Sequence, residues 1–167
     1  MDFLPDIKQS VIAPYFTDTQ QQILADMAEQ HIVHKNNTIF YEYSKQERLY
    51  LCAEGKVIIE RRSFRNMQIS PTLVYSVQRG NIFGEMGYID RHYSSATARA
   101  KSRVRLLTFD YESLNVLFEN DRDFGFRFMQ AISTQLARRL RRMNNKWLRQ
   151  FYHPSFFAYH GFHKDAS

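Results

Sequence analysis

The sequence predicts an α+β protein: a cupin-like antiparallel β-barrel, that is a jelly roll or double-stranded β-helix, with an N-terminal helix and a long C-terminal dimerisation helix. Three observations support this class. Four of the six glycines lie between residues 55 and 87, which concentrates turns there. Short runs rich in β-branched and aromatic residues surround these turns at close, regular spacing. Helical patterns occur only before and after this region, so we expect one core.

Length and composition indicate a single cytoplasmic domain. The chain has 167 residues, 44% of them apolar, and no apolar run approaches the roughly 20 residues of a membrane span. The N-terminal residues lack the basic and apolar regions of an export signal. Cys52 is the single cysteine, which fits a reducing compartment and excludes a disulfide framework or a cysteine-held metal cluster.

The first helix is predicted from its start signal. Thr17 and Gln20 have the spacing of a capping box. Ile23, Leu24 and Met27 follow at helical spacing and predict about three turns. We therefore expect the N-terminal helices to lie within residues 1–34.

The middle of the chain reads as strands. The clearest run is 72–78, where Leu73, Tyr75 and Val77 share one face of an alternating pattern. Several short strands without intervening helices favour a barrel or sandwich over a parallel sheet, and we place the barrel at residues 35–109. The runs expected to form strands are 38–42, 48–53, 56–62, 72–78, 96–100 and 103–109.

Two helices are predicted at residues 110–150. Asp110 is placed to cap the first, and a longer helix begins near Asp121. Apolar residues step along the long helix by three or four and form one stripe of about 33 Å. This stripe is longer than the face of a small barrel, so we expect a homodimer through the 121–150 helix. The stripe consists of Met129, Ile132, Leu136, Leu140, Met143 and Trp147.

Together these parts resemble the cyclic-nucleotide-binding domain of the catabolite-activator (CRP/FNR) family. The resemblance rests on the turn Gly80-x-x-Phe83-Gly84-Glu85, the strand "SSATARA" and the helix segment "ARRL", and it covers roughly residues 15–150. It implies that residues 1–150 form a sensor domain. Such a domain is a non-catalytic regulatory module that binds a small ligand in its barrel and signals through the C-terminal helix to a partner.

The resemblance also implies a ligand pocket. Gly84 would let the backbone approach a cyclic phosphate, whose charge suits the N–H groups at the start of a short helix. Glu85 would accept hydrogen bonds from a ribose hydroxyl. The pocket residues implied in this way are Phe83, Gly84, Glu85, Met86, Ser94, Ser95, Ala96 and Asn144.

The sequence departs from the family pattern at two places. Ser94 stands where cyclic-nucleotide-binding members have an arginine for the phosphate, and Arg91 is the candidate substitute. Met143 and Asn144 stand where adenine-reading members have a Thr-Ser pair, although an Asn amide can still pair with a base edge. The expected effector is therefore either a cyclic nucleotide or a divergent small molecule. No cofactor is assigned with certainty.

The end of the chain carries two further expectations. About 17 residues follow Gln150, fewer than a helix-turn-helix domain needs, so direct operator binding is not expected. The aromatic tail, residues 151–167, is expected either to pack on the protein or to dock a protein partner through 151–163. A metal or haem role for His153, His160 and His163 is the weaker interpretation.

Three other functions are alternatives to a ligand sensor. A cupin-type enzyme needs His and carboxylate ligands on adjacent strands, but His31, His34 and His92 do not lie on adjacent expected strands, so we assign no catalytic or metal-binding residue. A nucleic-acid or anionic-surface binder would use the arginines between Arg138 and Arg149. A ligand-free interaction module, or the sensor half of a transcription regulator, remains the main alternative to a ligand sensor.

Overall fold

The computed structural model describes residues 2–65 and 68–151. Its elements form two compact units, Met1–Met129 and Gln130–Ser167, and the packing described below belongs to the first. In chain order the elements are α1 (Leu4–Lys8), η1 (Ala13–Tyr15), α2 (Asp18–Met27), β1 (Glu29–Val33), β2 (Thr38–Phe40), β3 (Arg48–Glu54), β4 (Val57–Arg65), β5 (Gln68–Val77), β6 (Ile82–Phe83), α3 (Glu85–Asp90), β7 (Thr97–Ala100), β8 (Val104–Asp110), α4 (Tyr111–Asn120) and α5 (Arg122–Phe151).

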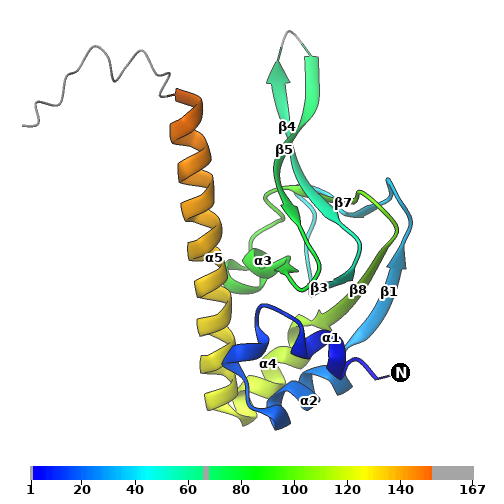
Figure 1. Ribbon diagram of the computed structural model, residues 1–167, viewed down its shortest axis with the longest axis vertical. Coiled ribbons are helices and arrows are strands. Elements are labelled where there is room, and N and C mark those ends of the chain that lie inside the picture. Colours follow the sequence, from blue (N-terminus) through cyan, green and yellow to red (C-terminus); the bar gives the residue numbers. More distant parts are fainter. Residues whose placement is uncertain (1, 66–67, 152–167) are drawn as a thin grey trace, which may run out of the picture. The chain divides into compact units, whose positions relative to one another are not determined.

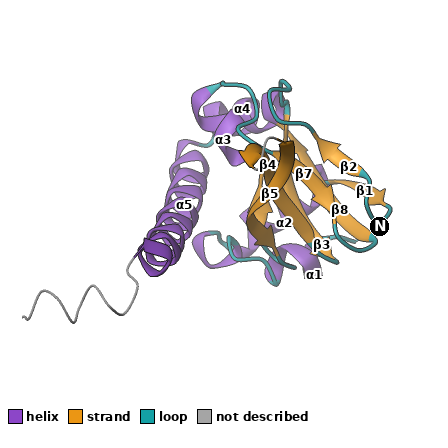
Figure 2. Cartoon of the chain, turned by 90° about the horizontal axis from the view of Figure 1, so that it is seen from above, coloured by secondary structure: helices purple, strands orange, loops and turns teal. Residues whose placement is uncertain are grey.

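The strands form two antiparallel sheets of four strands each. One sheet has the order β1-β8-β3-β6 and the other β2-β7-β4-β5, and every pairing is antiparallel. The two sheets lie together (Figure 2), and α1, α2 and α4 lie at one end of them (Figure 1). This arrangement confirms the predicted α+β jelly roll.

The core lies between the two sheets. Side chains from both sheets are fully or almost fully buried there, and each buried aliphatic side chain contributes about 1.5–3 kcal/mol relative to an exposed one. On β7 the buried residues are small, Ala98 and Ala100, which allows close packing. The buried cluster consists of Cys52, Val57, Ile59, Val77, Phe83, Ala96, Ala98, Ala100, Val104 and Leu106.

The predicted helix starts are confirmed by their caps. At α2 the Gln20 amide N–H donates to Thr17 Oγ1 over 3.2 Å, and the Thr17 N–H donates to Gln20 Oε1 over 3.1 Å. At α4 the carboxylate of Asp110 accepts from the N–H groups of Glu112 and Ser113, both at 3.0 Å. Each cap satisfies backbone donors that have no partner within the helix.

Two strands differ from the prediction. Residues 29–33 form β1 and pair with β8, so the strands begin at Glu29 and not at 35, and the preceding helix ends at Met27. Most of β1 is exposed, so its sequence lacks the apolar alternation that marks a strand. Strand β6 has only two residues between two turns and pairs with β3 through Phe83 and Tyr50, which is too short a run to detect by periodicity.

The hairpin β4–β5 is longer than predicted and projects beyond the other strands (Figure 1). Strand β7 pairs with β4 only as far as Glu60. Beyond that point the carboxylate of Glu42 accepts from Arg61 Nε over 3.0 Å and from the Arg62 N–H over 3.2 Å. Burial would raise the pKa of Glu42, but these hydrogen bonds outweigh it and hold the pKa below its ordinary value.

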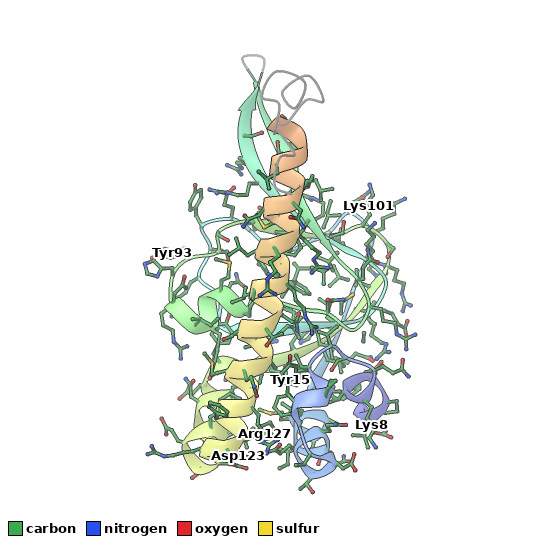
Figure 3. The ribbon with its side chains drawn as sticks, turned by 60° about the vertical axis from the view of Figure 1, so that its left-hand side comes forward. Lys8, Tyr15, Tyr93, Lys101, Asp123 and Arg127 are labelled. Carbon is green, nitrogen blue, oxygen red and sulfur yellow. The ribbon has the colours of Figure 1, made fainter. Side chains whose placement is uncertain are left out.

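The first turns of α5 pack against the N-terminal region. The rings of Phe16 and Phe124 meet edge to face at 5.1 Å. Arg127 donates to Asp123 over 2.6 Å and to the carbonyl oxygen of Tyr15 over 3.4 Å (Figure 3). These contacts fix the start of the long helix on the sandwich.

Helix α5 begins at Arg122, as predicted, and is 30 residues long. On its predicted stripe, Leu140 is 58% exposed and Met143 is 41% exposed. Both apolar side chains are therefore accessible within this chain. Dimerisation through the stripe stays a prediction.

Some predictions fall outside the described residues. The side chain of Trp147 is not among the described side chains, and the tail 152–167, with its three histidines, lies outside the described ranges. Within those ranges, no helix combines the length and the apolar composition of a membrane span.

Candidate ligand-binding site

The site begins at the turn between β6 and α3. Gly84 has a φ of +82°, the left-handed region that glycine adopts without strain. A Cβ at this position would lie 3.0 Å from Cδ2 of Tyr50 and 3.1 Å from the carbonyl oxygen of Arg48. Both backbone conformation and packing therefore require glycine. The turn directs the next residue, Glu85, into the protein.

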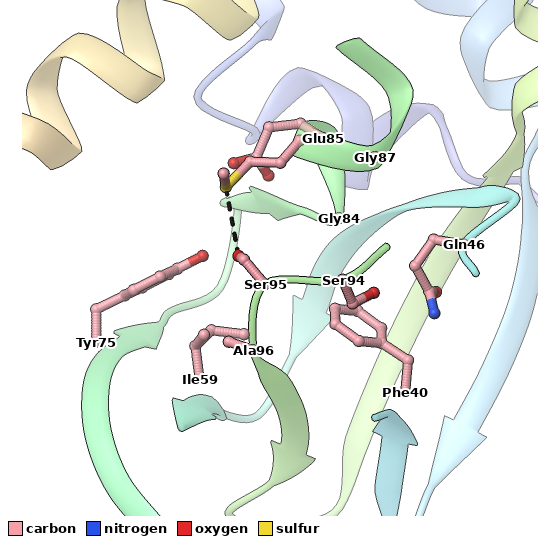
Figure 4. A pocket seen from close by; sticks show the side chains of 11 residues that line it. Phe40, Gln46, Ile59, Tyr75, Gly84, Glu85, Gly87, Ser94, Ser95 and Ala96 are labelled. Carbon is pink, nitrogen blue, oxygen red and sulfur yellow. Dashed lines mark hydrogen bonds between the residues drawn. The ribbon is translucent and has the colours of Figure 1, made fainter. Parts of the chain in front are cut away.

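Glu85 is buried, with an exposed fraction of 1%. A carboxylate in such a place is costly unless it is paired or hydrogen-bonded, so its retention here points to a specific role. In Figure 4 it lies with Gly84 and Gly87 on one side of a cavity. This placement agrees with the position that the sequence predicts for it.

The Gly84 turn is held from the other side by α4. The hydroxyl of Tyr111 donates to the carbonyl oxygen of Gly84 over 2.5 Å. Burial raises the pKa of Tyr111, so this hydroxyl stays protonated and remains a donor. The same hydroxyl would lie 3.3 Å from a Cβ on Gly87. Tyr111 therefore holds the N-cap residue of α3 and lies close to Gly87.

A cavity of about 40 Å³ lies at this turn. It opens between the β6–α3 turn and the segment that leads into β7 (Figure 4). Six of the eight residues predicted for the pocket line it. The lining residues are Phe40, Gln46, Ile59, Tyr75, Gly84, Glu85, Met86, Gly87, Ser94, Ser95 and Ala96.

Ser94 has a well-defined backbone and an unsatisfied side chain. Its carbonyl oxygen accepts from the Tyr43 N–H over 2.8 Å, and its own N–H donates to the Ser44 carbonyl oxygen over 2.9 Å. The side chain is buried, and its Oγ has no hydrogen-bond partner among the described residues. Such a hydroxyl costs about 1–3 kcal/mol. A ligand that hydrogen-bonds to it would recover this cost.

The neighbouring Ser95 is exposed, and its hydroxyl lies 3.7 Å from Sδ of Met86 (Figure 4). This weak contact joins the segment before β7 to the start of α3. In Figure 4 the ring of Tyr75, from β5, extends with its hydroxyl end toward Ser95. The cavity wall thus offers several hydroxyl groups beside one carboxylate.

The structure adds wall residues that the sequence analysis did not assign. Phe40, Ile59 and Tyr75 come from β2, β4 and β5, and Gln46 comes from the β2–β3 loop. Strand alternation marked Tyr75 as sharing a face with Val77, which is buried. Nothing in the sequence indicates that Gln46 would reach the same place, because that depends on the path of its loop.

Two predicted pocket residues are not in the wall. Phe83 is fully buried and stacks on Tyr50 at 5.0 Å and Phe40 at 6.0 Å, so it supports the cavity from within the core. Asn144 belongs to the second unit, and its assignment to the pocket stays a prediction.

Arg91 does not line this cavity, and its assignment as the substitute phosphate contact stays a prediction. Its guanidinium lies 5.1 Å from the ring centre of Tyr88 and 5.8 Å from that of Tyr111, and it donates to Asn115 over 3.2 Å. Arg91 has a left-handed backbone, with φ of +58°, and is the C-cap residue at which α3 ends.

A metal-dependent function was one of the alternatives considered from the sequence. Within residues 2–65 and 68–151 no three His, Cys, Asp or Glu side chains are grouped to hold a metal ion. Cys52 is buried in the core, and this burial raises its pKa to about 11.

The chain belongs to the family of cyclic nucleotide-binding domains, whose family model matches residues 30–121. It is 28% identical over 111 residues to the CRP-like cAMP-activated global transcriptional regulator of Mycobacterium tuberculosis, a match that covers 66% of this chain and 46% of that protein. It is 25% identical over 101 residues to the cAMP-dependent protein kinase regulatory subunit of Schizosaccharomyces pombe, covering 60% of this chain and 23% of that protein.

The fold is also similar to a crystal structure of a cyclic nucleotide-binding domain from Methylobacillus flagellatus. The TM-score is 0.81 with 16% identity, and the match covers 91% of this chain and 88% of that one. The chain spans less than half the length of each of these two curated relatives. By their names, both relatives are regulatory proteins.

Proposed function

We propose that this chain is a non-catalytic sensor module that binds a small effector in the cavity beside Gly84. The observation that carries the proposal is the convergence of a glycine turn, a buried carboxylate and an unsatisfied buried hydroxyl on one cavity. Polar groups that converge on one cavity beside apolar side chains are typical of small-molecule sites. The names of the two curated relatives supply the class of effector, a cyclic nucleotide.

Ser94 governs how tightly a cyclic nucleotide would bind. A serine hydroxyl gives one neutral hydrogen bond, whereas an arginine gives a charge-assisted and often bidentate pair with phosphate. Exchange of one for the other is worth about 1.5–3 kcal/mol. We therefore expect weaker binding of cyclic nucleotides than in members with arginine there, and a divergent effector remains within the proposal.

The output of the sensor is assigned to α5. Its exposed Leu140 and Met143 continue the apolar stripe, and a second copy of the same helix is the simplest partner for such a surface. Tyr111 is the first residue of α4, and its hydroxyl holds the Gly84 turn. An effector bound beside Gly84 therefore acts close to α4. A shift in helix packing is then read by a partner.

One observation favours a second candidate, a ligand-free interaction module. The cavity of about 40 Å³ is much smaller than the roughly 300–1,000 Å³ of most ligand sites. A nucleotide could enter only if the wall moved. A chain that has kept the fold but lost the ligand would show the same small cavity.

Thermal unfolding with cyclic AMP, cyclic GMP, cyclic dinucleotides and haem distinguishes the two. A ligand at about 100 times its Kd raises the free energy of unfolding by about 2.7 kcal/mol. We expect a stabilising ligand for the wild type, a reduced effect in Glu85→Gln and an unchanged effect in Glu119→Gln, which alters an exposed carboxylate on α4. If no compound stabilises the folded wild type, the ligand-free candidate is favoured.

A further inference from the structure

We propose that a second cavity, lined by the end of α3 and the start of α4, binds a small amino or hydroxy acid through Arg91, and that this binding acts on the Gly84 turn through Tyr111. The binding step does not depend on the proposed function. Only its use in regulating the first cavity does.

The second cavity has a volume of about 380 Å³, within the range of small-molecule sites. Three segments enclose it: the β2–β3 loop, the end of α3 with the residues after it, and the start of α4. All of them belong to the first unit. The lining residues are Lys45, Gln46, Glu47, Gly87, Arg91, His92, Asp110, Tyr111, Glu112 and Asn115.

Arg91 is held in a fixed position at this cavity. Its guanidinium lies over the rings of Tyr88 and Tyr111, at 5.1 and 5.8 Å from the ring centres. One nitrogen donates to Oδ1 of Asn115 over 3.2 Å, and Asn115 is held in turn by the Tyr88 hydroxyl at 3.0 Å. A guanidinium has five N–H donors. A fixed fork with donors to spare suits a carboxylate and loses little entropy on binding it.

Some charged groups around the second cavity already have partners, whereas another is accessible to a ligand. Lys45 is paired with Glu47 over 2.8 Å, and Oδ1 of Asp110 is used in the cap of α4. Arg91 makes no ion pair with any described residue. Its side chain is exposed, so the guanidinium is accessible to a ligand. Its positive charge is thus the one at this cavity that a ligand anion can neutralise.

The lining that comes from the start of α4 is acidic. Asp110 and Glu112 both line it, and both are exposed. They repel a second negative charge and favour a hydrogen-bond donor. A ligand with one carboxylate for Arg91 and one ammonium or hydroxyl group for the acidic side satisfies both halves. Amino and hydroxy acids have this pattern, whereas inorganic phosphate does not.

The two cavities share a wall. Gln46 and Gly87 line both, and a Cβ on Gly87 would lie 3.5 Å from Cβ of Gln46 and 3.3 Å from the Tyr111 hydroxyl. The ring of Tyr111 lies beneath Arg91, and its hydroxyl holds the Gly84 carbonyl. A ligand carboxylate that neutralises the charge above the Tyr111 ring therefore weakens the contact between this ring and Arg91, and Tyr111 is in turn bonded to the Gly84 turn.

Titration of the folded chain with L-serine and with L-lactate, followed by amide NMR spectra, tests the binding step. We expect saturable shifts in the segments 45–47, 87–92 and 110–115 at millimolar concentrations, and at least tenfold weaker binding in Arg91→Gly. Glycine is suited to the left-handed backbone at 91, so this variant keeps the local fold. Arg103→Ala, which removes an exposed arginine outside both cavities, should bind as the wild type does.

Three results would overturn the binding step: no saturable shift, equal affinity in Arg91→Gly, or tighter binding of inorganic phosphate than of either acid. Arg91→Lys keeps the charge without the planar fork, so binding close to that of Arg91→Gly supports the bidentate contact. Wild-type affinity in Arg91→Lys would contradict it.

The coupling is tested by Tyr111→Phe, which keeps the ring beneath Arg91 and removes only the hydroxyl. In the wild type, L-serine should shift the amide resonances of Gly84 and Glu85. In Tyr111→Phe these two shifts should disappear while those near Arg91 persist. Persistence of the Gly84 shift in the variant would contradict the route through Tyr111. None of these readouts requires a ligand in the first cavity, so failure here leaves the proposed function untouched.

Discussion

The hydroxyl of Tyr111 donates a hydrogen bond to the carbonyl oxygen of Gly84 over 2.5 Å, and so joins the start of α4 to the turn that forms the candidate pocket. Gly84 lies between β6 and α3, and Tyr111 directly follows β8. The contact therefore connects the pocket to the helical end of the sandwich. It also places the tyrosine between the pocket and the second cavity.

Tyr111→Phe should lower the free energy of unfolding by about 1 kcal/mol, because it removes one hydrogen bond and leaves the Gly84 carbonyl without that donor. Urea denaturation measures this change. Tyr93→Phe is the matched control, since Tyr93 is 68% exposed, and it should change stability by less than about 0.5 kcal/mol. Equal effects of the two substitutions would show that the hydroxyl of Tyr111 is not bonded as described.

Gly84→Ala should destabilise the protein by at least about 1 kcal/mol. The left-handed backbone is unfavourable for alanine, and its Cβ would lie 3.0 Å from the Tyr50 ring. Gly87→Ala is the control within the same helix, because its φ is not positive and its nearest contact is 3.3 Å. We expect a smaller loss for Gly87→Ala in thermal or urea denaturation. The reverse order would contradict the geometry of the turn.

Asp110 predicts a pH dependence of stability. The Ser113 N–H holds the pKa of the Asp110 carboxyl below its ordinary value. A carboxyl with a lowered pKa in the folded state stabilises the fold above its unfolded pKa of about 3.9 and loses this contribution as the pH falls through the folded value. Asn at the same position caps without titrating.

We therefore expect the difference in the free energy of unfolding between wild type and Asp110→Asn to change between pH 7 and pH 3. Urea denaturation at each pH measures this difference. The stability of the wild type relative to the variant should fall as the pH drops below about 4, with a total change of about 1 kcal/mol or less. A difference that stays constant over this range would mean that the cap carboxylate has an unperturbed pKa.

The apolar stripe on α5 predicts a self-association surface. Replacement of exposed Leu140 by Glu should weaken a dimer without unfolding the chain, because Leu140 is 58% exposed within it and a charge in a helix interface is costly. Sedimentation velocity measures the shift from dimer to monomer. Arg138→Glu, two residues away and also exposed, is the control for the charge change. A dimer unaffected by Leu140→Glu would place the interface elsewhere.

The predicted parts of this fold are those with local signals. Thr17 with Gln20, and Asp110 with Ser113, are contacts within one helical turn, so sequence spacing alone indicates them. Gly84 and Glu85 are adjacent in the chain, and their place at the pocket was implied by the resemblance to the family. Strand β1 was missed because its pairing with β8 joins residues about 75 positions apart, and its exposed side chains need no alternation.

The parts of the site that the sequence did not indicate depend on contacts between distant segments. Phe40, Gln46 and Tyr75 reach the cavity from three segments, and only the closure of the two sheets brings them together. Arg91 is three residues from Ser94, which suggested a shared role. The left-handed backbone at Arg91 and the attraction of its guanidinium to two tyrosine rings place it at the other cavity instead.

The most direct test of the pocket is a calorimetric titration of Ser94→Arg with cyclic AMP and cyclic GMP. If Ser94 occupies the phosphate position, the arginine should strengthen binding of at least one of them by about 10- to 100-fold over the wild type. Ser70→Arg, which adds the same charge on the exposed part of β5, should leave the affinity of the wild type unchanged. A folded Ser94→Arg protein that binds neither nucleotide more tightly than the wild type would contradict the assignment of this cavity as a cyclic-nucleotide pocket.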